Sequence, residues 1–379
     1  MNNLKISFNV APKLGPWGGG NLFIANLKKY LESSGNKVVF DLFEPDIDII
    51  FIIDPRMLSE SVIYSIKEID YYKTYVNKSC KVLHRINECD ERKGTEGINQ
   101  YYIEANKVAD HTIFVSEWLK NTYKDAGYLS KNQDVIMSGA NSDIFNNSGR
   151  EMWKKGEPLR IVTHHWGNNY NKGFDIYQQL DKKISSDFKD QYVFTYIGNM
   201  NKNIKLKSTQ LISPKSGIQL AKQIKQNHIY LTASINEPSG NHHIEGAQCG
   251  LPILYRNSGG TPEFTQGYGI SFEGSDDFLD SLDAIKKDYY QFYEKMLDYP
   301  YNSEEMCLEY LNLFKKLTKE GPYEISKVSG SIINRNVLGS FVYNYNKFLN
   351  YLNIYKFKIR IKKYLLIKFP ILKKERNVV

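Results

Sequence analysis

Two glutamates, eight residues apart, carry the clearest chemical signal in this chain. Glu237 follows the apolar run 229–235, which has the length and residue types of a buried strand, and Glu245 precedes a second such run at 251–255. A helix of about ten residues must therefore lie between the runs and start near Gly240. Glu237 would then lie at the carboxyl end of a strand, where parallel sheets bind ligands. The two carboxylates can converge on one ligand, although an ordinary βαβ turn with two solvated glutamates has the same spacing.

The residues between these glutamates favour an anionic ligand. Ser239, Gly240 and Asn241 would present backbone N–H groups at a helix N-terminus, where unpaired donors and the helix dipole attract a phosphate. Lys172 starts another predicted helix after a polar loop, so it is either a point charge for that phosphate or a solvated lysine. A glycosidase that uses the two carboxylates as acid and nucleophile is disfavoured, because the phosphate-binding features lie between them.

Alternating strands and helices must position these residues. The chain repeats apolar runs of strand length between helical segments, which is typical of the α/β class with parallel sheets. At 379 residues it is too long for one ordinary core and suits two domains. A polar connection at 146–158 divides two α/β series. We therefore predict domains at 1–150 and 151–325, followed by a helical, basic extension at 326–379.

The positive charge of the chain is concentrated at its end. Residues 351–379 carry nine lysines and arginines against one glutamate, which accounts for the whole formal charge of +8. This distribution disfavours nucleic acid as a partner of the globular body. A helical tail of this kind fits an anionic membrane surface, with about 1 kcal/mol for each basic residue near it. The alternatives are a solvated tail packed on the body and, for 356–362, a strand with period-two alternation.

The sequence predicts a cytoplasmic protein with reduced thiols, which the basic tail could attach peripherally to the inner face of the cell membrane. No stretch of 18 uncharged apolar residues occurs, and the first residues run directly into a predicted strand, so we expect neither a spanning helix nor a signal peptide. The four cysteines are scattered and form no CxxC or Cys/His cluster, which argues against structural zinc.

These features together resemble the GT-B glycosyltransferases of family 4, which are retaining enzymes that use nucleotide-activated sugars. The likeness extends over residues 4–320 and combines two α/β halves, a glycine-rich turn at 15–21 after the first strand, and the Glu237-x7-Glu245 pattern. It is most specific at 237–252 and 259–263, with support at 115–119, 138–141 and 172–173. It implies two Rossmann-like parallel-sheet domains that face each other across a cleft.

The resemblance also implies a role for each matching residue. Glu245 would hold the ribose hydroxyls of the nucleotide, and Glu237 would contact the donor sugar near the reacting centre. The diphosphate would lie against Ser239, Gly240, Asn241 and Lys172, with Gly18 and Gly19 approaching from the other domain. His84, at a strand end, loosely matches a histidine on the acceptor side, although such a residue is more often a hydrogen-bonded part of the fold.

One position departs from the family pattern. An arginine is expected about six residues before the lysine, and Trp166 occupies that place, after His164 and His165. Half of the cationic clamp on the diphosphate is therefore missing. Three explanations are open. Arg85 or a histidine takes the place of the arginine, the donor is not an ordinary nucleotide diphosphate sugar, or the chain is non-catalytic.

The resemblance predicts transfer of a hexosyl unit, with retention, from a UDP- or GDP-type sugar to a hydroxyl of a cell-surface glycan or lipid-linked acceptor. No cofactor and no metal are required by this arrangement. The alternatives are a non-catalytic GT-B partner or glycan-binding subunit and a nucleotide-sugar epimerase.

Overall fold

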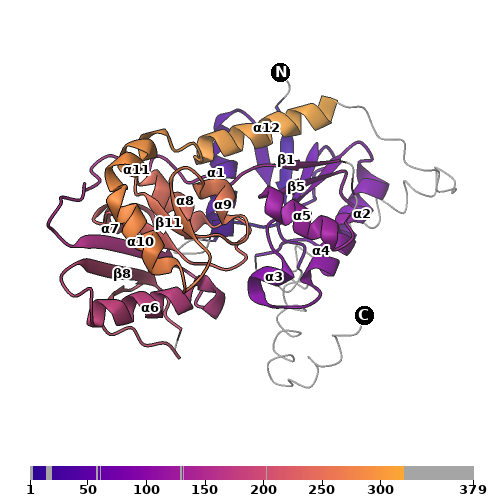
Figure 1. Cartoon of the computed structure of the whole chain (residues 1–379). Coiled ribbons are helices and arrows are strands. Elements are labelled where there is room, and N and C mark those ends of the chain that lie inside the picture. The colour runs from indigo at the N-terminus through magenta and orange to yellow at the C-terminus, as the bar shows by residue number, and fades with distance from the viewer. Residues whose placement is uncertain are drawn as a thin grey trace.

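The computed structural model describes residues 3–13, 19–56, 59, 61–128, 130, 132–201 and 203–319. Within them the chain forms two α/β halves that lie side by side (Figure 1). The predictions for Gly18 and for the basic extension at 326–379 lie outside the described residues.

The first half contains a parallel sheet of six strands. The strands are β1 (Lys5–Phe8), β2 (Lys37–Val39), β3 (Ile49–Ile52), β4 (Lys81–Ile86), β5 (His111–Phe114) and β6 (Gln133–Val135). Their spatial order is β2-β1-β3-β4-β5-β6. Every residue of β3 and β4 is buried, as expected for central strands that helices cover on both faces. The helices are α1 (Gly19–Ser33), α2 (Ile66–Tyr71), η1 (Tyr72–Val76), α3 (Asp90–Lys93), α4 (Ile98–Asn106) and α5 (Glu117–Asp125).

The second half repeats this plan with another six-stranded parallel sheet. Its strands are β7 (Leu159–His165), β8 (Tyr192–Gly198), β9 (Gln210–Ile212), β10 (Ile229–Thr232), β11 (Ile253–Arg256) and β12 (Gly269–Phe272). Their order is β12-β11-β10-β7-β8-β9. The helices are η2 (Tyr170–Lys172), α6 (Phe174–Ser185), α7 (Gly217–Lys225), α8 (Asn241–Gln248), α9 (Thr261–Thr265), α10 (Phe278–Lys287), α11 (Tyr289–Lys295), η3 (Met296–Asp298) and α12 (Ser303–Lys319). The predicted helix between the two glutamates is α8, which begins one residue after Gly240.

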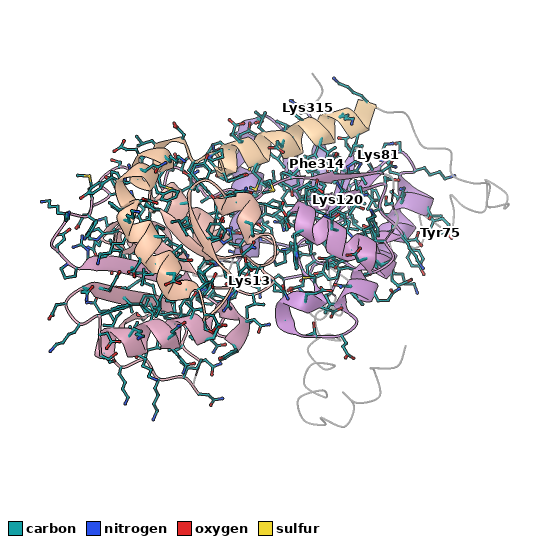
Figure 2. The ribbon with its side chains drawn as sticks, in the orientation of Figure 1. Lys13, Tyr75, Lys81, Lys120, Phe314 and Lys315 are labelled. Atoms are coloured by element: carbon teal, nitrogen blue, oxygen red, sulfur yellow. The ribbon has the colours of Figure 1, made fainter. Side chains whose placement is uncertain are left out.

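The last of these helices, α12, returns to the first half and completes its core. Tyr310 and Phe314 are fully buried, and both pack against Phe51 of β3, with ring centroids 5.6 and 5.5 Å apart. Figure 1 shows α12 running from the second half along the first, and Figure 2 marks Phe314 on it. The sequence-based boundary placed this helix in the second domain, 151–325, because a boundary read along the chain cannot reveal a helix that crosses back.

Two sequence motifs meet where the halves join. Ser116 accepts a hydrogen bond from the backbone N–H of Leu119 (3.2 Å) and caps α5. Glu263 of α9 reaches the same helix end, where its carboxylate accepts the backbone N–H groups of Glu117 (2.8 Å) and Trp118 (2.6 Å). A carboxylate at a helix N-terminus is favourable, because it satisfies unpaired donors and complements the dipole. The motifs at 115–119 and 259–263 thereby fix the two sheets relative to each other.

We expect Phe314→Ala to lower the free energy of unfolding of the first half by about 3–5 kcal/mol, because the lost ring leaves a cavity in its core. Leu308→Ala on the exposed face of the same helix is the matched control and should change stability by about 0.5 kcal/mol or less. Chemical denaturation followed by circular dichroism measures both. Equal effects of the two substitutions would contradict the packing of α12 on the first half.

Candidate functional site

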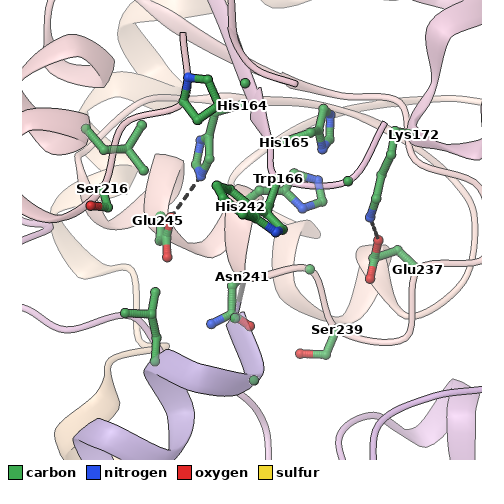
Figure 3. A pocket seen from close by; sticks show the side chains of 18 of the residues that line it. His164, His165, Trp166, Lys172, Ser216, Glu237, Ser239, Asn241, His242 and Glu245 are labelled. Atoms are coloured by element: carbon green, nitrogen blue, oxygen red, sulfur yellow. Dashed lines mark hydrogen bonds and ion pairs between the residues drawn. The ribbon is translucent and has the colours of Figure 1, made fainter. Parts of the chain in front are cut away.

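A cavity of about 350 Å³ lies between the halves, at the carboxyl ends of strands from both sheets. The first half contributes residues of α1, of β4 and of the loop and short helix that follow β4. The second half contributes the end of β7, the loop before α6, and the loop and helix after β10 (Figure 3). Sheets of this kind bind ligands at this edge, and clefts between domains are frequent ligand sites. The cavity is therefore the candidate site.

Glu237 is buried in the cavity and is held there by two cations. It is almost fully buried, and its carboxylate forms a hydrogen-bonded ion pair with Lys172, drawn as a dashed line in Figure 3. The guanidinium of Arg92, from the other half, lies 3.1 Å from its second oxygen. Burial alone would raise the pKa of Glu237, but the charges of Arg92 and Lys172 outweigh burial and lower the pKa to about 2. Glu237 is thus a carboxylate at any physiological pH.

The position of Lys172 depends on the glycine that follows it. Gly173 has φ 96°, a left-handed conformation that favours glycine, and a side chain there would collide with Ala233 after β10. The chain can therefore turn from η2 into α6 close against β10, which carries the ammonium group of Lys172 to Glu237. Burial lowers the pKa of Lys172, and the neighbouring carboxylate opposes that shift.

Glu245 lies on the opposite wall and is held by a histidine. Its Oε2 is 2.8 Å from Nε2 of His164, and Nδ1 of that ring is 3.0 Å from the hydroxyl of Tyr230. All three side chains are buried. This chain of contacts fixes the orientation of the glutamate toward the cavity.

Two helix N-termini face each other in the cavity. Gly19 opens α1 and Asn241 opens α8, and they approach so closely that a Cβ atom on Gly19 would lie 2.7 Å from Asn241 Cγ. Within the described chain, no side chain caps α8. Ser239 Oγ is buried and has no hydrogen-bond partner among the residues that the structure describes. Unpaired backbone donors, two positive dipole ends and an unsatisfied hydroxyl together favour an anionic ligand.

Four histidines cluster beside the place where the sequence lacks an arginine. His164, His165, His242 and His243 are all buried, and the rings of His165 and His242 are 4.6 Å apart. Burial lowers the pKa of His165 and of His242 well below the ordinary value, and lowers that of His243 to about 3. These three imidazoles are uncharged near neutral pH, so in this state they do not replace the missing cation. Trp166 itself is half-exposed at the cavity.

The two residues predicted on β4 point in opposite directions. Arg85 lines the cavity, stacks 4.0 Å over the ring of Phe23 and donates Nε–H to the hydroxyl of Tyr310 (3.2 Å). Its Nη1 has no acceptor among the described residues. His84 instead faces α4, with Nδ1 2.8 Å from Oδ1 of Asn106. Successive strand residues alternate between faces, so the two cannot both reach the cavity.

The structure therefore does not bring His84 to the site. The ring is fully buried, and burial lowers its pKa to about 4. Its place at a strand end suggested a functional role, but the sequence does not show which face of the sheet the His84 side chain occupies.

Arg92 is the site residue that the sequence interpretation missed. It lies in α3, in a run of charged residues that follows β4. The charge of Glu237 raises its pKa. A charged loop at the carboxyl end of a parallel strand was the available signal, but nothing in it singles out this arginine.

The described residues offer no metal cluster and no membrane-spanning helix. They contain no group of three or more His, Cys, Asp or Glu side chains placed to hold a metal ion. None of their helices is both long and apolar enough to cross a membrane.

Comparison with known proteins identifies the fold. No protein-family model matches the chain. An alignment of 193 positions, which covers 48% of this chain and 41% of the other protein, shows 26% identity to the phosphatidylinositol N-acetylglucosaminyltransferase gpi3 subunit of Schizosaccharomyces pombe. The chain thus spans about two fifths of the length of this curated relative.

Solved structures resemble the chain over most of its length. Sucrose-phosphate synthase (tll1590) from Thermosynechococcus elongatus aligns with a TM-score of 0.61 and 12% identity over 84% of this chain and 100% of that one. Anabaena Alr3699/HepE, in complex with UDP and glucose, aligns with a TM-score of 0.60 and 10% identity over 83% and 100%. The chain therefore has the two-domain, Rossmann-like GT-B fold of these glycosyltransferases.

The ion pairs of Glu237 predict a pH-dependent difference between the protein and its Glu237→Gln variant. Removing one partner of a buried ion pair should cost about 3 kcal/mol at pH 7, because Lys172 and Arg92 lose their counter-charge. The pKa of Glu237 is lower in the folded protein than its ordinary value of 4.5, so its contribution is complete above that pH and is lost as pH falls toward about 2.

Thermal unfolding of both proteins between pH 7 and pH 3 measures this difference. We expect the gap in melting temperature to be widest near neutral pH and to narrow below pH 4.5. A gap that stays constant over the whole range would show that Glu237 is not held as a carboxylate by these cations.

Proposed function

We propose that the protein is a retaining glycosyltransferase of the family 4 type, which moves a hexosyl unit from a UDP- or GDP-sugar to a hydroxyl of a glycan or lipid-linked acceptor. The observation that carries this proposal is the pair of helix N-termini that face each other beside Lys172 and between Glu237 and Glu245. The GT-B fold supports it, and so does the complex of Anabaena Alr3699/HepE with UDP and glucose.

In this proposal the donor's diphosphate lies at the N-terminus of α8. The Ser239 hydroxyl, the first backbone N–H groups of α8 and the ammonium group of Lys172 stabilise the negative charge that grows on the leaving diphosphate. Gly19 allows the backbone of α1 to approach from the other side. The transition state resembles an oxocarbenium ion, and its stabilisation depends on positioning and electrostatics more than on a strong base.

The two glutamates have different roles. Glu245 accepts hydrogen bonds from the ribose hydroxyls, and His164 holds it in that orientation. Glu237 accepts hydrogen bonds from the donor sugar and, as a carboxylate with a pKa of about 2, is unsuited to donate a proton. This argues against a glycosidase with Glu237 as the general acid. The transferase requires no metal or other cofactor in this scheme.

A non-catalytic partner or glycan-binding subunit is the second candidate. It is favoured by Trp166 at the position where the family has an arginine, because a buried phosphate that loses a charged donor is held less tightly.

The cellular site of action follows from the substrate class. A lipid-linked acceptor would be met at the inner face of the cell membrane, and nucleotide sugars are met in the cytoplasm. We propose that the basic segment 351–379 attaches the protein peripherally to anionic lipids there.

Turnover of sugar nucleotides tests the proposed function. The purified protein is incubated with UDP- and GDP-hexoses, and release of the nucleotide is measured without and with candidate acceptors. We expect Glu237→Gln to lower kcat by about 100-fold, because it removes a contact near the reacting carbon. We expect Glu245→Gln to raise the KM for the donor about tenfold with a smaller effect on kcat.

The exposed Glu294→Gln, on α11, is the matched control and should leave both constants unchanged. Nuclear magnetic resonance of the product should show that the anomeric configuration is retained. Binding of a sugar nucleotide without any turnover would favour the non-catalytic candidate, and neither binding nor turnover would reject both.

A further inference from the structure

The ion pairs around Glu237 form one network that spans both halves of the molecule. In the first half, Glu88 lies 3.4 Å from Arg92, 2.5 Å from Lys93 and 3.8 Å from Arg56. Arg92 links this group to Glu237 in the second half. Within the described residues, the network has three carboxylates and four cations: Asp54, Glu88 and Glu237, with Arg56, Arg92, Lys93 and Lys172. One positive charge is therefore in excess within this network, which reaches the cavity at Arg92, Lys93, Lys172 and Glu237.

We propose that Arg92 supplies, from the first half, the second cation that holds the donor's diphosphate, in place of the arginine that is absent at Trp166. This inference rests on the proposed function and assigns the missing half of its phosphate clamp. The clamp is then shared between the halves, with Lys172 on one side of the cleft and Arg92 on the other.

The surroundings of Arg92 place it where such a cation must lie. It lines the cavity together with Lys172 and Glu237, and both cations contact the same carboxylate. Its Nε is buried and lies 3.1 Å from Glu237 Oε1, yet it makes no hydrogen bond to any described residue. A guanidinium with an unused donor beside an excess positive charge favours an additional acceptor such as a phosphate oxygen.

The competing cations fit this role less well. Arg85 is held within the first half by Phe23 and Tyr310. Burial keeps the neighbouring imidazoles His165 and His242 uncharged. Of these groups, Arg92 alone combines a charge with a direct contact to the partner of Lys172.

Hydrogen bonds from side chains of the second half to backbone carbonyls of the first hold α3 in place. Asn171, next to Lys172, donates its side-chain N–H to the carbonyl of Arg92 (3.3 Å). Asn236, next to Glu237, donates to the carbonyl of Glu91 (3.3 Å). The donor site is therefore complete only when the two halves are in contact, so binding of the diphosphate and closure of the cleft stabilise each other.

Nucleotide binding by calorimetry tests the inference through the preference for a diphosphate over a monophosphate. Dissociation constants are measured for UDP and UMP, and for GDP and GMP, with wild type and Arg92→Gln. We expect Arg92→Gln to weaken diphosphate binding by about 10- to 100-fold and to reduce the preference for the diphosphate. Arg92→Lys should keep most of the preference, because it keeps the charge.

Two further variants separate a direct contact from an indirect effect through Glu237. In a Glu237→Gln background, Arg92→Gln should still reduce the diphosphate preference if Arg92 contacts the phosphate. Adding Trp166→Arg to Arg92→Gln should restore part of it, because the arginine returns to the position that the family uses. Arg56→Gln, in the same ion network but away from the cavity wall, is the control for altered charge alone and should keep the preference.

The possible failures are distinct. If wild type prefers a nucleoside diphosphate and Arg92→Gln and Arg92→Lys both keep that preference, the inference is overturned and the proposed function stands. If the effect of Arg92→Gln disappears in the Glu237→Gln background, Arg92 only positions the glutamate and the phosphate contact is overturned. If wild type binds no nucleoside diphosphate, the proposed function fails and the inference fails with it.

Discussion

The burial of one carboxylate at the junction of two domains is the constraint on which the site depends. An ionised Glu237 in this position is tolerated only because Lys172 and Arg92 compensate its charge from opposite sides of the cleft. Charge compensation requires the turn at Gly173, which places Lys172 beside Glu237. It also requires α3 of the first half to contact the second half, because α3 carries Arg92. An ion pair that crosses the cleft also couples the cavity to the relative position of the two sheets.

Other contacts across the junction also hold the two halves together. Glu263 caps α5 from the second half, and α12 inserts Tyr310 and Phe314 into the core of the first. Tyr310 also receives a hydrogen bond from Arg85 on the cavity wall. The crossing helix therefore supports the cavity as well as the fold, because its Tyr310 positions Arg85, which lines the cavity.

Much of this architecture is predictable from the sequence. Apolar runs of strand length and the residues typical of helix starts identify the alternating strands and helices and the start of α8, because these depend on local pattern. The predicted donor-site residues that the structure describes, from Gly19 to Glu245, do line one cavity. What they bind there stays a prediction.

The remaining features depend on tertiary contacts that no local pattern encodes. His84 and Arg85 are adjacent, and only the sheet decides which of them faces the cavity. Arg92 lies in a polar loop whose charges look solvated until the second half is placed beside it. The crossing of α12 is similarly invisible, because an amphipathic helix has the same pattern whichever core it covers.

A crystal structure of the protein with a bound nucleoside diphosphate tests the central claim most directly. We expect UDP or GDP in the cavity between the halves, with phosphate oxygens within hydrogen-bond distance of Lys172 and of the first backbone N–H groups of α8. The ribose should lie against Glu245. A nucleotide bound elsewhere, or one whose phosphates avoid these groups while Glu237 keeps both cations, would contradict the claim that the ion network is built for a diphosphate.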